Sequence, residues 1–419
     1  MSMRSIRKSL LQFIFSGADM RRWNDKLRPV ELFELDKQAH KMIVAFLLWQ
    51  KNTDTLPEDE ARRVGLEVIE GGIFDYFYRL IITDIKPPVF YRIKANREHY
   101  AQLTSWVLGD LEPRIRPLDE DFWQRLVTYH RRPHESRNTL SDRILNAAHL
   151  YASRWEFSLI EPLNFFDEEM KEIGPSFNKS LLDLSDIAGV GELVAMPPAT
   201  ALARMANLSG QLRFQIRWAQ TPRVPATSVL GHMFIVAVYA HLFSLYLGAC
   251  EQRRINDFYC GLFHDLAELL TRDIITPVKR SVAELPKILH QYEAEELHRK
   301  ILDPLEKEGY GHIRERLAYY LGLETHSEFN DTCCCDDGVK KLEGFDELHE
   351  AWNKNECDPK DGRLIKACDV LAAFIEAYSS IHNGIGSPQL YEAMARMRRD
   401  TSQLRFGPFS LATLLADFD

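Results

Sequence analysis

Two histidines and two aspartates in the second half of the chain are the types of side chain that hold a divalent metal ion. His264 and Asp265 are adjacent, His232 precedes them and Asp369 follows, so three separate segments must converge. Mixed imidazole and carboxylate donors suit a transition ion that keeps open positions for water and substrate. Such an ion polarises a phosphoryl oxygen and lowers the pKa of bound water. These four residues therefore predict a metal-dependent site that hydrolyses a phosphate ester.

Glu268 strengthens this interpretation of the His264-Asp265 pair. A lone His-Asp dipeptide more often marks a helix start with a hydrogen-bonded histidine than a metal site. Glu268 follows His264 by four residues, which places both on one helix face. A carboxyl group there can act as general acid or base for the leaving oxygen. We therefore predict Glu268 and Asp265 as catalytic residues, with Asp265 also a metal ligand.

Helices must position these residues, because apolar side chains recur at three- and four-residue spacing along most of the chain. Strand-like alternation is scarce, so the sequence predicts an all-α fold. Breaks are predicted at Gly174 to Ser176 and at Pro197 to Thr200, where Gly and Pro interrupt the pattern. The polar stretch from Glu324 to Asp337 is interpreted as an exposed loop with incidental thiols, because the consecutive Cys333 to Cys335 cannot readily face one tetrahedral metal ion.

An internal repeat organises the chain, since four short motifs occur twice in the same order at similar separations. They predict two tandem related helical domains, residues 1–180 and 181–419. The four pairs are Arg22-Trp23 with Arg217-Trp218, the segment from His40 with the segment from His232, Gly72–Asp84 with Gly261–Asp273, and Arg143–His149 with Arg363–Asp369.

The N-terminal copy is predicted to be degenerate. In this alignment its counterparts of His264, Asp265, Glu268 and Asp369 are, in that order, Asp75, Tyr76, Arg79 and His149. An arginine and a phenol are poor substitutes for carboxylates around a cation. A structural or dimerising role is favoured for this copy, so the chain is a possible homodimer. Regulation through a pocket around His40 and His149 stays open, judged only from the two imidazoles.

Composition limits the partners. The 419 residues carry a formal charge of −9, which gives no strong attraction to a nucleic acid polymer. Seven cysteines without paired spacing favour a reducing, cytoplasmic setting. No stretch was expected to approach the roughly 18 to 20 apolar residues of a membrane span. The segment Met1 to Phe15 is interpreted as an amphipathic helix packing on the protein, with surface membrane contact as an alternative.

The ordered motifs of the second half resemble the 5′-deoxynucleotidase branch of the HD-domain phosphohydrolases. The resemblance covers about residues 205 to 390 and is most specific from Phe263 to Lys279. It is carried by Arg217-Trp218, His232, His264-Asp265-Leu-Ala-Glu268, Asp273, Thr276-Pro277-Val278-Lys279 and Lys366-Ala-Cys-Asp369.

The resemblance implies an HD-domain helical fold, one divalent ion and hydrolysis of 2′-deoxynucleoside 5′-monophosphates. It assigns the metal to His232, His264, Asp265 and Asp369, the proton to Glu268 and the phosphate to Arg217, whose planar fork suits such a group. Trp218 and Asp273 would face the sugar, and Lys279 is the remaining residue predicted to bind substrate. The family usually has a Ser and an acid just before the first metal histidine, where this chain has Leu230 and Gly231. Gly231 was expected to widen the pocket rim for a larger substrate.

Three functions follow from these observations. The first is the deoxynucleotide phosphomonoesterase, with a small phosphorylated substrate. The second is a dNTP triphosphohydrolase or a phosphatase for another small phosphate ester. The third is a non-catalytic metal and nucleotide sensor, which the presence of Glu268 disfavours, because binding alone needs no proton donor. Mn, Co, Fe, Ni and Zn all suit the donors, so the metal stays open.

Overall fold

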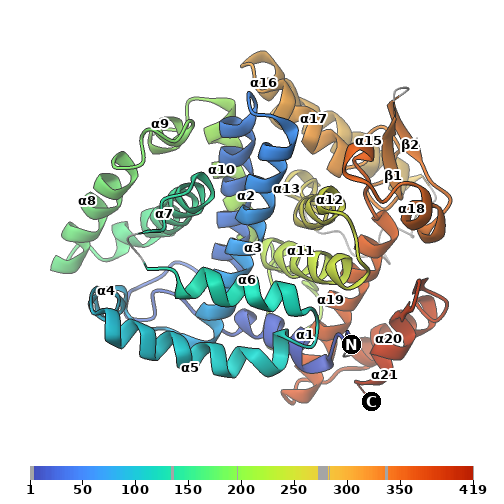
Figure 1. Ribbon diagram of the computed structural model, residues 1–419, viewed down its shortest axis with the longest axis horizontal. Helices are drawn as coiled ribbons and strands as arrows, with labels where there is room; N and C mark the ends of the chain where they lie inside the picture. The colour runs from blue at the N-terminus through green and yellow to red at the C-terminus, as the bar shows by residue number, and fades with distance from the viewer. Residues whose placement is uncertain are drawn as a thin grey trace.

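The computed structural model describes residues 4–133, 136–195, 197–271, 282, 284–335 and 338–418. Helices dominate the described part, and the strands are restricted to two short antiparallel pairs. The prediction of an all-α fold is confirmed. Two groups of helices lie side by side in Figure 1, the earlier part of the chain in blue to green and the later part in yellow to red.

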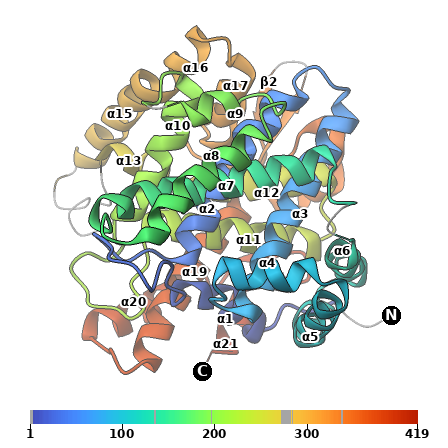
Figure 2. The same ribbon diagram turned by 90° about the vertical axis from the view of Figure 1, so that its left-hand side faces the viewer.

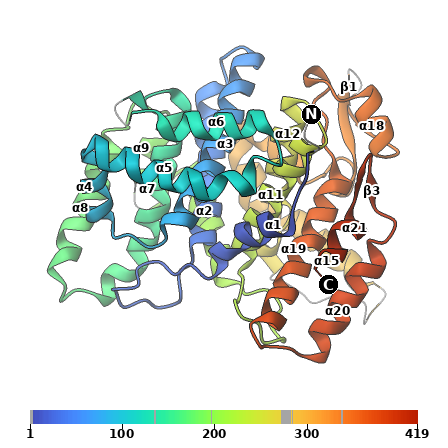
Figure 3. The same ribbon diagram turned by 60° about the horizontal axis from the view of Figure 1, so that its bottom comes forward.

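The first group, called here the N-terminal lobe, surrounds the long helices α2 and α3. Its helices α5 and α6 lie side by side, as Figure 3 shows. Figure 2 shows α7 and α8 crossing its outer face. The lobe comprises α1 (Lys8–Phe15), α2 (Glu34–Thr53), α3 (Glu58–Ile82), α4 (Pro87–Ala95), α5 (Arg97–Ile115), α6 (Glu120–Arg131), α7 (Leu140–Ile160) and α8 (Glu168–Leu182).

The second group, the C-terminal lobe, is built around α11 (Val229–Tyr246), α12 (Glu251–Phe263) and α19 (Gly362–His382). The short helices α9 (Val190–Val194) and α10 (Ala201–Gly210) connect the lobes. The remaining elements are α13 (Glu268–Thr271), α15 (Leu285–Leu297), α16 (Asp303–Lys307), α17 (Gly311–Tyr320), β1 (Thr332–Cys335), β2 (Gly338–Lys341), α18 (Phe345–Ala351), α20 (Pro388–Asp400), β3 (Arg405–Phe406), β4 (Phe409–Ser410) and α21 (Leu411–Ala416).

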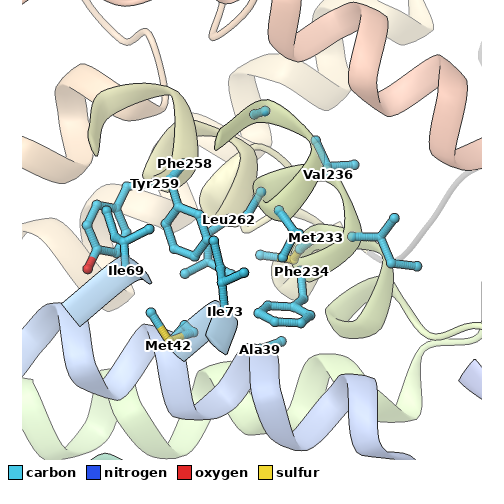
Figure 4. Close-up of a cluster of buried hydrophobic side chains, with 14 of the residues drawn as sticks. Ala39, Met42, Ile69, Ile73, Met233, Phe234, Val236, Phe258, Tyr259 and Leu262 are labelled. Carbon is cyan, nitrogen blue, oxygen red and sulfur yellow. The ribbon is translucent and has the colours of Figure 1, made fainter. Parts of the chain in front are cut away.

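The two lobes share one hydrophobic core. α2 packs directly against α11, and α3 packs against α12. Figure 4 shows this contact, where Ala39 and Met42 of α2 and Ile73 of α3 meet Phe234 and Leu262 of the C-terminal lobe. All five side chains are completely buried. Burial of this much apolar surface is the main term that holds the two groups of helices together.

The first helix also joins the lobes. In α1 the residues Leu10, Leu11 and Ile14 are buried in the shared core, as expected for an amphipathic helix packing on the protein. The Lys8 ammonium donates a hydrogen bond of 2.8 Å to the Tyr378 hydroxyl on α19.

Several sequence boundaries need correction. Gly174-Pro175 lies inside α8 and does not end it, and the proposed domain boundary at residue 180 falls within the same helix. The polar stretch from residue 324 contains β1, which carries the three consecutive cysteines. Helix α11 is long and apolar enough to cross a membrane by length and composition, contrary to expectation, but 94% of its 18 residues are buried inside the protein.

Candidate metal centre

His232 lies in the first turn of α11, and local contacts fix its position. The Ser228 side chain caps the helix by accepting a hydrogen bond of 2.9 Å from the Gly231 amide. The Ser228 hydroxyl itself donates to the Asp36 carboxylate on α2. The imidazole of His232 is completely buried, and its Nδ1 lies 3.2 Å from Glu376 Oε1. With Nδ1 donating to this carboxylate, Nε2 keeps its lone pair for a metal ion.

His264 follows the last residue of α12, whereas Glu268 begins the separate helix α13, so the two residues do not share one helix face as predicted. Its Nδ1 donates to the Gly261 carbonyl at 2.8 Å, so Nε2 is the nitrogen that faces the centre and would bind a metal ion once deprotonated. This buried Nε2 has no protein hydrogen-bond partner among the described residues. Gly261 allows α12 to approach α11 closely, because a Cβ there would lie 2.9 Å from the Ala237 Cα.

Asp369 completes the centre from two turns inside α19. One carboxylate oxygen lies 3.0 Å from His232 Nε2, and the other accepts a hydrogen bond of 2.8 Å from Lys366 Nζ. One ligating atom from each of His232, His264 and Asp369 lies within 4.8 Å of the others. This is the one such group of metal-binding residue types among the residues that the structure describes.

These three residues fit a divalent transition ion. Two imidazole nitrogens and one carboxylate oxygen are donors of the right kind, and each histidine is oriented by a hydrogen bond on its other nitrogen. The orphaned Nε2 of His264 is a buried polar atom that a bound ion would satisfy.

Asp265 lies beside this triad but outside its 4.8 Å grouping. Its Oδ2 is 3.2 Å from His264 Nε2 and 3.2 Å from Arg217 Nη1. The carboxylate therefore faces both a predicted metal ligand and the predicted phosphate-binding arginine. Its role as a ligand stays a prediction, as do the other roles assigned to residues of this centre.

The charged side chains of the centre shift one another's pKa values. Burial alone would lower the pKa of His264, but the Asp265 and Asp369 carboxylates raise it to about 9. Burial would raise the pKa of Asp369, but the contact with His232 and the charge of Lys366 hold it well below its usual range. The carboxylates thus stay ionised, and a proton on His264 balances part of their charge. A divalent ion would displace that proton.

Glu376 was not identified from the sequence, although it organises the centre. It is completely buried on α19, seven residues and two helical turns after Asp369. Besides His232, it accepts hydrogen bonds from Trp218 Nε1 at 2.7 Å and from the Thr227 hydroxyl at 2.8 Å. Arg217 Nε lies 3.6 Å from it. One carboxylate therefore orients the first metal histidine and both residues of the Arg217-Trp218 motif. Its spacing from Asp369, on the same helix face, was the signal that could have found it.

The structure gives fewer contacts for the other predicted site residues. Glu268 begins α13, and its charge raises the pKa of Arg217, after the larger effects of Glu376 and Asp265. Trp218 is half-buried, with its indole fixed by Glu376 and its backbone at a φ of 58°. Asp273 and Lys279 lie outside the described residues.

Gly231 does not line the rim of the centre as expected. A Cβ at this position would lie 2.9 Å from Asp36 Oδ1 and 3.2 Å from the Leu35 Cβ, both on α2. Because Gly231 has no side chain, α2 of the N-terminal lobe can pack closely against this turn of α11. The expectation that Gly231 widens the substrate pocket is not supported by this position.

The consecutive cysteines form a short strand. Cys333 and Cys335 lie on one face of β1 with their sulfur atoms 3.7 Å apart, whereas Cys334 Sγ contacts Asp358 Oδ2 at 3.4 Å. The alternation of side chains along a strand separates the middle thiol from its neighbours. All seven cysteines are free thiols.

Two buried histidines and an aspartate, from α11, the end of α12 and α19, with an arginine at the edge, are an arrangement that could hold a metal ion in an all-α domain. Residues 209–398 match the family model of the HD domain. This match covers somewhat less than half of the chain and supports an HD-domain relationship for that part, and an HD domain in general indicates a metal-dependent phosphohydrolase. Neither a curated protein nor a solved structure matches the chain.

Proposed function

We propose that the protein is a metal-dependent phosphomonoesterase that hydrolyses 2′-deoxynucleoside 5′-monophosphates to the deoxynucleoside and phosphate. The observation that carries the proposal is the position of Arg217, whose guanidinium contacts Asp265 at the edge of the His232, His264 and Asp369 centre. A phosphate held by this arginine would lie against the centre. The match to the HD domain supports phosphate-ester chemistry in general.

The residues of this chain supply four tasks. His232, His264 and Asp369, with Asp265 beside them, would hold the divalent ion, which supplies Lewis-acid polarisation of a phosphoryl oxygen and an acidified water. Arg217 binds the phosphate through paired N–H donors. Glu268 donates a proton to the leaving 5′ oxygen. Trp218 closes the sugar side with a fixed indole that leaves little room for a 2′ hydroxyl.

The first test measures phosphate release from dAMP, AMP and dATP by protein that has been stripped of metal and resupplied with Mn²⁺, Co²⁺ or Mg²⁺. The proposal expects metal-restored release from dAMP and much less from AMP. Tripolyphosphate from dATP would instead establish a triphosphohydrolase. Nucleotide binding without turnover on any of the three substrates would favour the sensor.

A variant pair tests the sugar assignment separately. Trp218→Ala should raise the activity on AMP relative to dAMP, because the wall against the 2′ hydroxyl is removed. Trp155→Ala is a matched control, since this tryptophan lies edge-on to His40 and hydrogen bonds to Asn207, away from the centre. An unchanged dAMP to AMP ratio in Trp218→Ala would overturn the sugar role of this residue.

A further inference from the structure

The N-terminal lobe contains a counterpart of the metal centre. A backbone bridge joins Arg21 to Phe33, and another joins Ile216 to Ser228, immediately before α2 and α11 begin. Between the bridging residues, Trp23 and Trp218 share an unusual positive φ, 56° and 58°. Trp23 Nε1 donates to Glu156 at 3.0 Å, just as Trp218 Nε1 donates to Glu376 at 2.7 Å.

These contacts define which residues correspond. Because α2 and α11 each begin one residue after the bridge, the fourth residue of α2, Lys37, is the counterpart of His232, in place of the His40 suggested by the sequence. Lys37 Nζ lies 2.7 Å from His149 Nδ1, and His232 Nε2 lies 3.0 Å from Asp369. The His–Asp pair of one lobe is thus matched by a Lys–His pair in the other.

The two centres differ in charge. The C-terminal lobe has one more carboxylate than lysine and arginine side chains, which a proton on His264 or a divalent ion balances, whereas in the N-terminal lobe Lys37 is a buried cation without a carboxylate partner among the described residues. The C-terminal groups are Asp265, Glu268, Asp369 and Glu376 with Arg217, Arg223 and Lys366. The N-terminal groups are Glu34, Asp75 and Glu156 with Arg22, Lys37, Lys41 and Arg79, and Asp36 and Arg213 add one group of each sign.

Lys37 carries the unbalanced positive charge, and the neutral His149 ring accepts a hydrogen bond from it. Lys37 is buried and has no carboxylate within ion-pair distance in the described part of the chain. An ammonium can only donate, so His149 Nδ1 accepts and the hydrogen of the neutral ring is on Nε2. His149 is exposed to solvent, and its Nε2 has no hydrogen-bond partner among the described residues. The lobe therefore presents an N–H donor with a buried cation directly behind it.

We propose that His149, backed by Lys37 and the nearby guanidinium of Arg22, binds the phosphate group of a small phosphorylated ligand without cleaving it. Arg22 and Arg217 occupy corresponding positions, and both side chains are 13% exposed. Burial, Arg22 and Lys41 together lower the pKa of Lys37 to about 7, so a bound anion would stabilise its charged form.

The site lacks the groups that hydrolysis needs. Asp75, in the place of His264, is held by Lys41 Nζ at 2.8 Å and by the Tyr129 hydroxyl at 3.1 Å. The hydroxyl of Tyr76, in the place of Asp265, donates to the Ile14 carbonyl at 2.5 Å and is completely buried. Neither residue is free to hold a divalent ion. The inferred site is therefore one for binding alone, and it does not depend on the activity proposed for the other lobe.

The test measures binding of inorganic phosphate, dAMP and deoxyadenosine to metal-free full-length protein by calorimetry and thermal unfolding. Without metal the C-terminal centre offers a phosphate no divalent ion, and the Arg217→Gln variant reports any contribution of that lobe to the signal. Inorganic phosphate should bind with saturation, and deoxyadenosine should not bind. Tighter binding of dAMP would identify a nucleotide as the ligand, and equal or weaker binding would identify free phosphate.

Variants assign the signal to the lobe. His149→Gln should weaken phosphate binding at least about tenfold, and Lys37→Met should abolish it. His149 is exposed, so His149→Gln gives a folded variant even if Lys37→Met does not fold. Arg217→Gln in the other lobe and His298→Gln at an exposed histidine should leave the binding unchanged.

Four results would overturn the proposal, of which the first three concern phosphate binding. These are no phosphate binding by the metal-free protein, binding that survives His149→Gln, and binding lost in Arg217→Gln instead. Deoxyadenosine binding as strong as that of dAMP would also contradict it, because the base would then be recognised. All readouts are binding measurements without turnover, so they stay separate from the test of the phosphomonoesterase.

Discussion

The two lobes have similar local backbone geometry around different charged side chains. Each has a tryptophan bound to a buried glutamate, Trp23 with Glu156 and Trp218 with Glu376. In one lobe the space in front of this glutamate holds histidine and aspartate, and in the other it holds lysine and histidine. A helical scaffold can therefore be retained while one centre has the donors that would hold a divalent ion and the other has the ammonium of a lysine.

The largest expected effect comes from removing a predicted metal ligand of the C-terminal lobe. His264→Ala and Asp369→Ala should each reduce phosphate release on the order of 10⁴-fold, since each removes a group on which the whole centre depends. Circular dichroism should show unchanged helicity. His298→Ala is the control, because His298 lies 3.3 Å from Asp303 in an exposed His–Asp pair outside the centre. Full activity in Asp369→Ala would exclude this site.

The next effect concerns the two buried glutamates. Glu376→Gln should lower metal affinity or turnover by about 10- to 100-fold, because His232, Arg217 and Trp218 lose the carboxylate that orients them. Metal content measured after dialysis checks this. Glu156→Gln is the matched change in the other lobe and should lower stability without lowering metal content. Equal metal loss in both variants would mean that the lobes do not differ as described.

A third prediction tests the contact between the lobes through pH. Burial would raise the pKa of Glu70, but His241 and Arg125 lower it to about 2. A carboxyl whose folded pKa is depressed stabilises the fold fully above its unfolded pKa of about 4.5, and this stability is lost as pH falls toward 2.

Glu70→Gln should therefore cost about 3 kcal/mol of unfolding free energy at pH 7. The loss should shrink as the pH falls from about 4.5 to 2, as measured by denaturant titration. Glu120→Gln, which removes an exposed pair with Arg116, should change the free energy of unfolding far less. A pH-independent loss in Glu70→Gln would contradict the assigned charge.

The smallest expected effect is the loss of stability on metal removal, which should depend on the C-terminal lobe alone. Chelation should lower the free energy of unfolding by about 2.7 kcal/mol relative to protein with ion at 100 times its Kd, seen as a fall in Tm. His264→Ala should show no such fall. A fall that persists in His264→Ala would place a metal elsewhere in the chain.

The sequence predicted the helices and brought the right segments together, because apolar spacing and metal-binding residue types can both be recognised locally. It did not reveal Glu376, since burial of one glutamate among many on helices depends on tertiary packing. It paired His40 with His232 because the apolar residues that follow are alike, whereas the backbone bridges place Lys37 there. The role of Gly231 was also misjudged, because a contact with α2 cannot be inferred from one helix alone.

The hydrogen bond from Ser228 to Asp36 has a consequence for how the protein could be divided. The cap of the helix that carries His232 is completed by a residue of the other lobe. A protease that cuts between α8 and α10 should therefore leave two fragments that copurify and behave as a heterodimer. We therefore expect the noncovalent contacts between the lobes, and not the peptide segment that connects them, to hold the helix of His232 in place.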